Sequence, residues 1–188
     1  MTEVIERHGG WVNEFIGDAI LAVFGTPEAH ADDPLNACRC AIEMQIPTDQ
    51  MNQELRAASR PTLEMGIGLH SGEAVVGNIG SSRRVKWGVI GDAVNMTARI
   101  ESLTIGTQIL VSGDLLNLVE QQVESSERKQ VKVKGRTRFL EISELFSIPN
   151  DGISIPQAVV HPLVDTERTA EIYRLEGKAL AAEALEVK

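Results

Sequence analysis

The sequence predicts an α/β sandwich in which helices cover a mostly antiparallel sheet. Helix-like and strand-like segments alternate along the chain, and several strand candidates occur in pairs joined by short glycine-containing turns. The chain has 188 residues and is 43% hydrophobic, which is enough for one domain with a substantial core.

A short hairpin is the clearest element of the N-terminal region. Gly9 and Gly10 are expected to end a helix in the first residues. Residues 11–16 and 19–24 then form two apolar strands, and the Gly17-Asp18 pair between them is typical of a type II′ turn. The hairpin carries two carboxylates, Glu14 and Asp18.

A long helical region follows this hairpin. Asp33 is a suitable N-cap and Pro34 suits the first helical position. Pro47 is expected to end or kink this helix, because its ring removes a backbone donor, and residues 48–59 are expected to resume it.

The middle of the chain continues the alternation. We expect residues 63–72 and 73–80 to form a second strand pair, and residues 129–145 to form a final hairpin or long strand. The elements between them are a strand at 85–91, a helix at 92–103, a strand at 107–112 and a helix at 113–121.

Composition and charge restrict the classes of function. The formal net charge of −9 argues against nucleic-acid binding. No apolar run approaches the ~20 residues of a membrane helix, and the first ten residues lack the features of a signal peptide, so we expect a cytoplasmic protein. Cys38 and Cys40 are expected to be small buried residues without a disulfide or metal.

Several polar side chains could take part in phosphate chemistry. Asp18 at the hairpin tip could bind a hard cation such as Mg²⁺, although an isolated Gly-Asp is usually a turn. Asn95 and Arg99 lie four positions apart on a predicted helix and could face a phosphate, although such a pair is usually solvated. Lys134 belongs to a basic stripe that could instead protect an edge strand.

Three segments together resemble a known family. "HGGWVNEFIGDAILAVFG", "GIGLHSGEAVVGNIGSSRRVKWGVIGDAVNMTARIES" and "VKVKG" are similar to the catalytic domain of class III purine nucleotidyl cyclases. The resemblance covers residues 1–146 and implies a ferredoxin-like α/β sandwich, with active sites at the interface of a head-to-tail homodimer. Residues 147–188 are expected to form a proline-containing linker and a C-terminal helix.

The resemblance implies a role for each candidate residue. Asp18 matches a metal-binding aspartate of a site for two Mg²⁺ or Mn²⁺ ions. Asn95 matches the residue that positions the ribose, and Arg99 the one that stabilises charge on the α-phosphate. Lys134 matches a lysine that holds the terminal phosphates.

Base selection follows from two further positions. Adenylyl cyclases of this family usually carry Lys where Glu14 stands and Asp or Thr where Gly88 stands, whereas Glu14 matches the guanylyl cyclase pattern. A carboxylate can accept from guanine N1–H and the 2-amino group, and adenine has no donor at N1. We therefore predict GTP as the favoured substrate and cGMP as the product, with ATP as the alternative.

One feature departs from the family pattern. Its first metal aspartate lies on an upstream strand, and none of the seventeen residues before Asp18 is an aspartate. The first strand of the family fold is therefore expected to be missing. The chain is either part of a larger cyclase, a non-catalytic cyclase-like module, or one that complements an intact cyclase chain.

Overall fold

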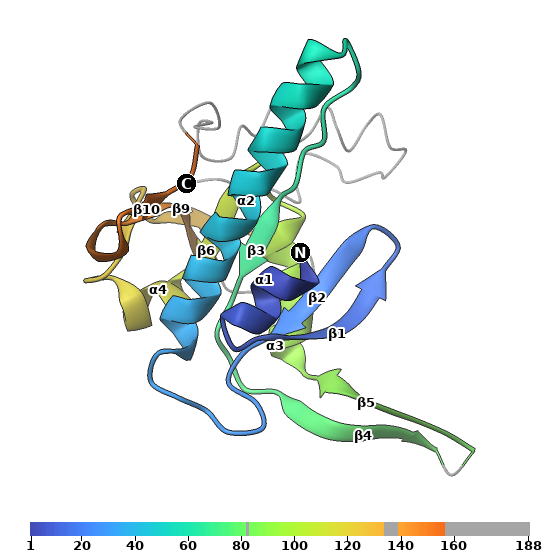
Figure 1. Ribbon diagram of the computed structural model, residues 1–188. Coiled ribbons are helices and arrows are strands. Elements are labelled where there is room, and N and C mark those ends of the chain that lie inside the picture. Colours follow the sequence, from blue (N-terminus) through green and yellow to red (C-terminus); the bar gives the residue numbers. More distant parts are fainter. Residues whose placement is uncertain (82, 134–138, 157–188) are drawn as a thin grey trace.

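The computed structural model describes residues 1–81, 83–133 and 139–156 (Figure 1). Helices and strands alternate through this part of the chain, as predicted. The elements, in chain order, are α1 (Thr2–Arg7), β1 (Trp11–Ile16), β2 (Ala19–Val23), α2 (Asp33–Ala57), β3 (Ile67–Leu69), β4 (Val75–Ser81), β5 (Arg84–Ile90), α3 (Asp92–Glu101), β6 (Ile109–Ser112), α4 (Gly113–Val119), β7 (Glu124–Ser125), β8 (Lys129–Val131), β9 (Leu140–Ile148), the 3-10 helix η1 (Pro149–Asp151) and β10 (Ile153–Ser154).

The main sheet contains six strands. Its order is β10-β9-β6-β3, and β7 and β8 also pair with β9. The β3–β6 pair is parallel, with Ile67 opposite Ile109, and the other pairs of this sheet are antiparallel. The mostly antiparallel sheet of the prediction is therefore confirmed.

The predicted pairing of residues 63–72 with 73–80 is wrong. β3 pairs with β6, and β4 pairs with β5 over seven residue pairs from Val75–Ile90 to Ser81–Arg84. The β4–β5 hairpin extends away from the body of the molecule, as Figure 1 shows. The sequence of a strand does not by itself say which other strand it pairs with. The pairing of β3 with the distant strand β6 therefore could not be predicted.

The helix α2 corrects a second expectation. It runs through Pro47 as one helix of 25 residues and does not end there. Gln45 is almost fully buried, and its Nε2 donates to the backbone oxygens of Met65 and Thr107 at 2.7 and 2.9 Å. Asn52 Nδ2 donates to the backbone oxygen of Leu63 at 2.7 Å. These tertiary bonds on both sides of Pro47 offset its local cost of roughly 3 kcal/mol.

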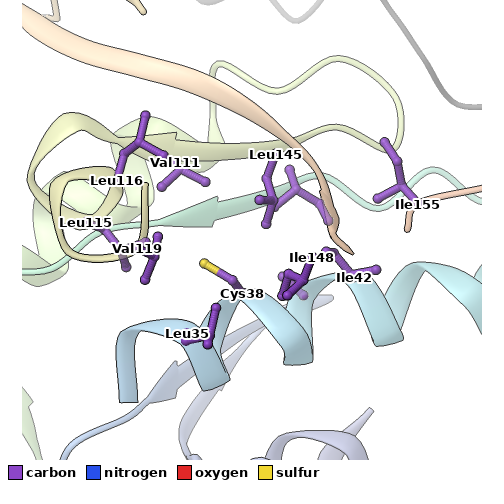
Figure 2. Close-up of a cluster of buried hydrophobic side chains, with 12 residues drawn as sticks. Leu35, Cys38, Ile42, Val111, Leu115, Leu116, Val119, Leu145, Ile148 and Ile155 are labelled. Atoms are coloured by element: carbon purple, nitrogen blue, oxygen red, sulfur yellow. The ribbon is translucent and has the colours of Figure 1, made fainter. Parts of the chain in front are cut away.

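Helices cover both faces of the main sheet. Leu110 in β6 packs with Met96 and Ile100 of α3 on one face. Its neighbours Ile109 and Val111 point to the other face, because side chains alternate along a strand. Figure 2 shows that second cluster, in which α2, α4 and β9 contribute apolar side chains, among them Cys38, Ile42, Leu115, Leu116, Leu145 and Ile148.

The predicted burial of the two cysteines is confirmed. Cys38 and Cys40 are buried and free. Burial raises the pKa of the Cys38 thiol to about 12 and that of Cys40 to about 11. Both thiols are therefore protonated at neutral pH and act as small apolar groups of the core.

The chain after residue 146 continues into the sheet. β9 ends at Ile148, η1 follows, and β10 folds back to pair with β9. Arg39 of α2 donates from Nε and Nη2 to the carboxylate of Asp151, at 2.5 and 3.3 Å. The helix predicted near the C-terminus lies outside the described residues. Within the described part of the chain, no helix is both long and apolar enough to cross a membrane.

Candidate functional site

The β1–β2 hairpin presents Asp18 at its tip. Ile16 pairs with Ala19, so Gly17 and Asp18 are the two turn residues. Gly17 has a φ of 65° and Asp18 has no positive φ, which is the φ pattern of the predicted type II′ turn. Asp18 is exposed, and its carboxylate makes no hydrogen bond or ion pair with the described residues. It is therefore open to a ligand or cation.

Glu14 lies further back on β1 and is paired with a lysine. Lys86 Nζ of β5 lies 2.5 Å from Glu14 Oε1. Both side chains are about half exposed, at 52% and 48%. The carboxylate is therefore held in place from one side and remains accessible on the other.

A second contact joins β1 to β5 next to Gly88. The backbone N–H of Val89 donates to Asn13 Oδ1 at 3.1 Å. A Cβ placed on Gly88 would lie 2.9 Å from that same oxygen. Two side-chain contacts therefore join the strands that carry the two predicted base-selecting positions, Glu14 on β1 and Gly88 on β5.

The helix α3 carries Asn95 and Arg99. Gly91 precedes it with a φ of 153°, and a Cβ there would lie 3.2 Å from the Ala74 Cα and from the Glu73 backbone oxygen. Asn95 is exposed and Arg99 is partly buried. Neither side chain has a partner among the described residues. Both remain available to a phosphorylated ligand.

Lys134 lies outside the described residues, so its predicted role stays a prediction. The strand β8 ends at Val131, and Lys132 follows as a partly buried residue. The predicted basic stripe therefore begins just beyond this strand.

The described residues provide only part of a metal site. They contain no group of three His, Cys, Asp or Glu side chains placed to hold a metal ion. Asp18 is thus a single carboxylate at the predicted metal position. A site for two divalent cations needs further oxygen ligands from elsewhere. The described residues alone do not fit such a site.

A cavity of about 420 Å³ lies between β2 and β3 and does not contain the predicted site residues. Consecutive residues of both strands line it, from Ile20 to Phe24 and from Ile67 to His70. Because alternate residues line the face of a strand, a consecutive run indicates that strand edges border the cavity. Residues of α2 and α3 close its two sides, among them Ala37, Met44, Ala93 and Thr97.

The two bordering strands each have an unpaired edge. Among the described elements, β2 pairs with β1 alone and β3 pairs with β6 alone. The hairpin and the main sheet are therefore separate sheets with the cavity between their edges. One extended strand in that position could pair with both.

Sequence reasoning missed Asn13 and Lys86. Lys86 lies two positions before Gly88, and this spacing places both on one face of β5. That signal could have identified Lys86. Asn13 precedes Glu14 and is expected on the opposite face of β1, so its contact with β5 could not be predicted.

Comparison with known proteins gives a consistent result. Residues 1–145 match the family described as "Adenylate and Guanylate cyclase catalytic domain". The chain is 32% identical over 149 residues to "Adenylate cyclase 1" of Rhizobium meliloti and 36% identical over 154 residues to "Adenylate cyclase" of Anabaena cylindrica. These alignments cover 78% and 77% of this chain but only 22% and 30% of the relatives.

Solved structures of the same kind are similar in fold. The guanylyl cyclase Cya2 has a TM-score of 0.75 at 41% identity, over 82% of this chain and 79% of that one. The adenylyl cyclase CyaB from P. aeruginosa has a TM-score of 0.70 at 27% identity, over 77% and 76% of the two chains. The guanylate cyclase domain of RhGC from Catenaria anguillulae, in complex with GTP, has a TM-score of 0.66 at 25% identity, over 78% and 77%.

Proposed function

Because this chain belongs to the family of adenylate and guanylate cyclase catalytic domains, we propose that it forms cGMP and pyrophosphate from GTP. The observation that carries the preference for GTP is the position of Glu14. Its carboxylate pairs with Lys86, two positions before Gly88 on β5, and its side chain is about half exposed. The similarity to Cya2, a guanylyl cyclase, supports the same substrate.

The choice of base follows from hydrogen-bond matching. Glu14 offers acceptors, and guanine offers donors at N1–H and at the 2-amino group. Adenine has an acceptor at N1 and would leave the carboxylate unmatched. A partly buried polar site that is left unpaired discriminates strongly between ligands, so GTP is favoured over ATP.

The reaction forms a bond between the ribose 3′-oxygen and the α-phosphorus. The 3′-hydroxyl loses its proton, and the bond from the α-phosphorus to the bridging oxygen breaks, so pyrophosphate leaves. In this proposal Asn95 holds the ribose, and the Arg99 guanidinium stabilises the negative charge that develops on the α-phosphate. Lys134 binds the terminal phosphates.

Asp18 would contribute one carboxylate to a site for Mg²⁺ or Mn²⁺. Such ions, two of them in the family site that the sequence resembles, neutralise triphosphate charge and lower the pKa of a bound hydroxyl. Among the described residues, only Asp18 stands at that position. A further carboxylate could reach this site on a segment that fills the cavity between β2 and β3.

The same proposal places the first strand of the family fold in that cavity. The two unpaired edges of β2 and β3 border it, and its apolar sides suit an extended chain. Such a strand would carry the second metal aspartate.

A homodimer is the proposed assembly. Exposed apolar side chains gather on two hairpins, with Phe15 and Ile16 on β1 and Val75, Val85, Trp87 and Ile90 on β4 and β5. Exposed apolar groups of this kind mark association surfaces. In a head-to-tail pair, Asp18 of one chain would serve the site that contains Glu14, Asn95 and Arg99 of the partner.

A non-catalytic module is the second candidate. The single carboxylate at the metal position favours it, because the nucleotide could bind without reacting. An adenylate cyclase is the third candidate, and Glu14 argues against it because adenine offers no donor for that carboxylate.

The deciding experiment measures cGMP and cAMP formed by the chain with Mn²⁺ and GTP or ATP. The proposal predicts cGMP as the main product and its loss in Asp18→Ala, with no loss in the control Asp32→Ala, which changes another exposed aspartate. Tight GTP binding without product, both alone and with an added intact cyclase chain, would favour the non-catalytic module. A kcat/KM for ATP equal to that for GTP would contradict the proposed substrate preference.

A further inference from the structure

Asn13 occupies an irregular position in β1. Val12 pairs with Ala22 and Glu14 pairs with Leu21, so Asn13 between them has no partner in β2. This shift in register is a bulge, and bulges redirect side chains. In a regular strand Asn13 and Glu14 would point to opposite faces.

The bulge allows both side chains to reach β5. Asn13 Oδ1 accepts a hydrogen bond from the Val89 backbone N–H at 3.1 Å, and Glu14 pairs with Lys86. Two successive residues of one strand therefore face the strand that carries Gly88. They lie together at the proposed base-reading position.

The bond to Val89 also orients the Asn13 amide. A backbone N–H can bond only to an acceptor, so the amide oxygen must face Val89 and the NH₂ group must point elsewhere. That NH₂ group has no partner among the described residues. Its nitrogen, Nδ2, is not fully buried, so a ligand can reach it.

Gly88 makes room for this amide. A Cβ at position 88 would lie 2.9 Å from Asn13 Oδ1, whereas the next nearest group, Ile79 Cδ1, would be 3.8 Å away. The Asn13 side chain therefore occupies the space that a side chain at position 88 would need. The observed position of the Asn13 side chain therefore requires glycine at position 88.

We propose that Asn13 determines base specificity by donating from Nδ2 to the 6-carbonyl of guanine. This inference rests on the proposed function and supplies a donor that Gly88 cannot provide. Glu14 would accept from N1–H and the 2-amino group, and Asn13 would bind the remaining polar group of the same base edge. Adenine carries an amino group at position 6, so the Asn13 amide would face a second donor there.

The test compares dissociation constants for GTP, ITP and ATP in the wild-type chain and in Asn13→Asp. Aspartate keeps the shape of the side chain and an acceptor for Val89, but it has no donor. The proposal predicts that GTP and ITP, which share the 6-carbonyl, both bind roughly tenfold more weakly. ATP binding should be retained or tightened, because the new acceptor matches the 6-amino group of adenine, so the preference for GTP over ATP falls by at least the same factor.

Two further variants separate the loss of the donor from a change of charge or of stability. Asn13→Ala removes the donor without adding a negative charge next to Glu14, and it should also lower the GTP preference. Asn117→Asp makes the same chemical change at an exposed position of α4 and should leave all three constants unchanged. Thermal unfolding of each variant shows whether the fold is retained.

The outcomes separate this inference from the proposed function. A wild-type chain that prefers GTP, with the preference retained within twofold in both Asn13 variants, would overturn the role of Asn13 alone. A wild-type chain that binds ATP as tightly as GTP, or binds neither, would overturn the proposed function and this inference with it. Equal weakening of GTP and ATP would mean that Asn13 only supports the fold.

Discussion

Lys86 and Glu14 join the two hairpins of the proposed base site through an ion pair of 2.5 Å between Nζ and Oε1. Both groups are about half exposed, so the pair contributes about 1 kcal/mol or less to stability. The main effect of the ion pair is to orient the Glu14 carboxylate, and therefore its two acceptor oxygens. The same contact allows base preference to be tested with little effect on the fold.

Exchanging the two charges should move the preference toward ATP. Glu14→Lys alone would place two ammonium groups side by side and weaken nucleotide binding. In Glu14→Lys with Lys86→Glu the ion pair is restored in reverse, and a lysine now faces the base. We expect the ratio of kcat/KM for GTP to that for ATP to fall roughly tenfold or more in the double variant.

The control exchanges another exposed pair, Arg128 and Glu120, whose atoms Nη2 and Oε1 lie 2.9 Å apart. That double variant should keep the wild-type ratio. If the Glu14 and Lys86 exchange also left the ratio unchanged, base choice would lie outside this pair.

The proposed homodimer predicts a change of mass after one substitution on β5. Val85 is 59% exposed on the projecting hairpin. Val85→Glu would place a charge in an apolar interface, so sedimentation velocity should show a shift from dimer to monomer. Leu118→Glu on α4, where the side chain is 55% exposed, is the matched control and should leave the mass unchanged. A monomeric wild-type chain would exclude the dimer.

Local sequence signals predicted the positions of helices and strands better than they predicted which strands pair. Gly17 and Asp18 identified the first hairpin because a two-residue turn leaves few other arrangements. The parallel pairing of β3 with β6 depends on residues more than 40 positions apart, such as Ile67 and Ile109, and no local signal encodes it. The same holds for Pro47, where distant hydrogen bonds of Gln45 and Asn52 decide that the helix continues.

In the candidate site, too, some residues could be predicted from local sequence and one could not. Glu14, Gly88, Asn95 and Arg99 could be named from motifs because their spacing is fixed within each segment. The role of Asn13 depends on a bulge, which shifts the alternation of β1 by one residue. A regular pattern of alternate faces cannot reveal such a shift.

Gly68 should be essential for the packing of β3 against α3. A Cβ at this position would lie 2.4 Å from the backbone nitrogen of Glu101, and backbone cannot move aside as a side chain can. We expect Gly68→Ala to lower the free energy of unfolding by about 1–3 kcal/mol, measured by urea denaturation. Gly72→Ala should cost less, because its nearest neighbour is the His70 ring at 3.0 Å. Equal losses would contradict this packing argument.

The buried carboxyl of Glu144 predicts that stability depends on pH. Glu144 on β9 is 1% exposed, and Gln108 Nε2 donates to its Oε2 at 3.1 Å while Oε1 has no partner among the described residues. Burial raises the pKa of this carboxyl from 4.5 to about 7, more than the bond from Gln108 lowers it. Between these two values the folded chain holds a proton that the unfolded chain has released.

The free energy of unfolding should therefore fall as the pH rises from about 5 to about 8. The contribution of Glu144 is complete below pH 4.5 and is lost as the pH passes through about 7, for a total of about 3 kcal/mol. Glu144→Gln keeps an acceptor for Gln108 and carries no charge, so it should remove this decrease and be the more stable protein at pH 8. Glu64→Gln, at an exposed position, should leave the decrease intact. Urea denaturation at pH 5 and pH 8 measures both, and an unchanged pH dependence in Glu144→Gln would assign the effect to other groups.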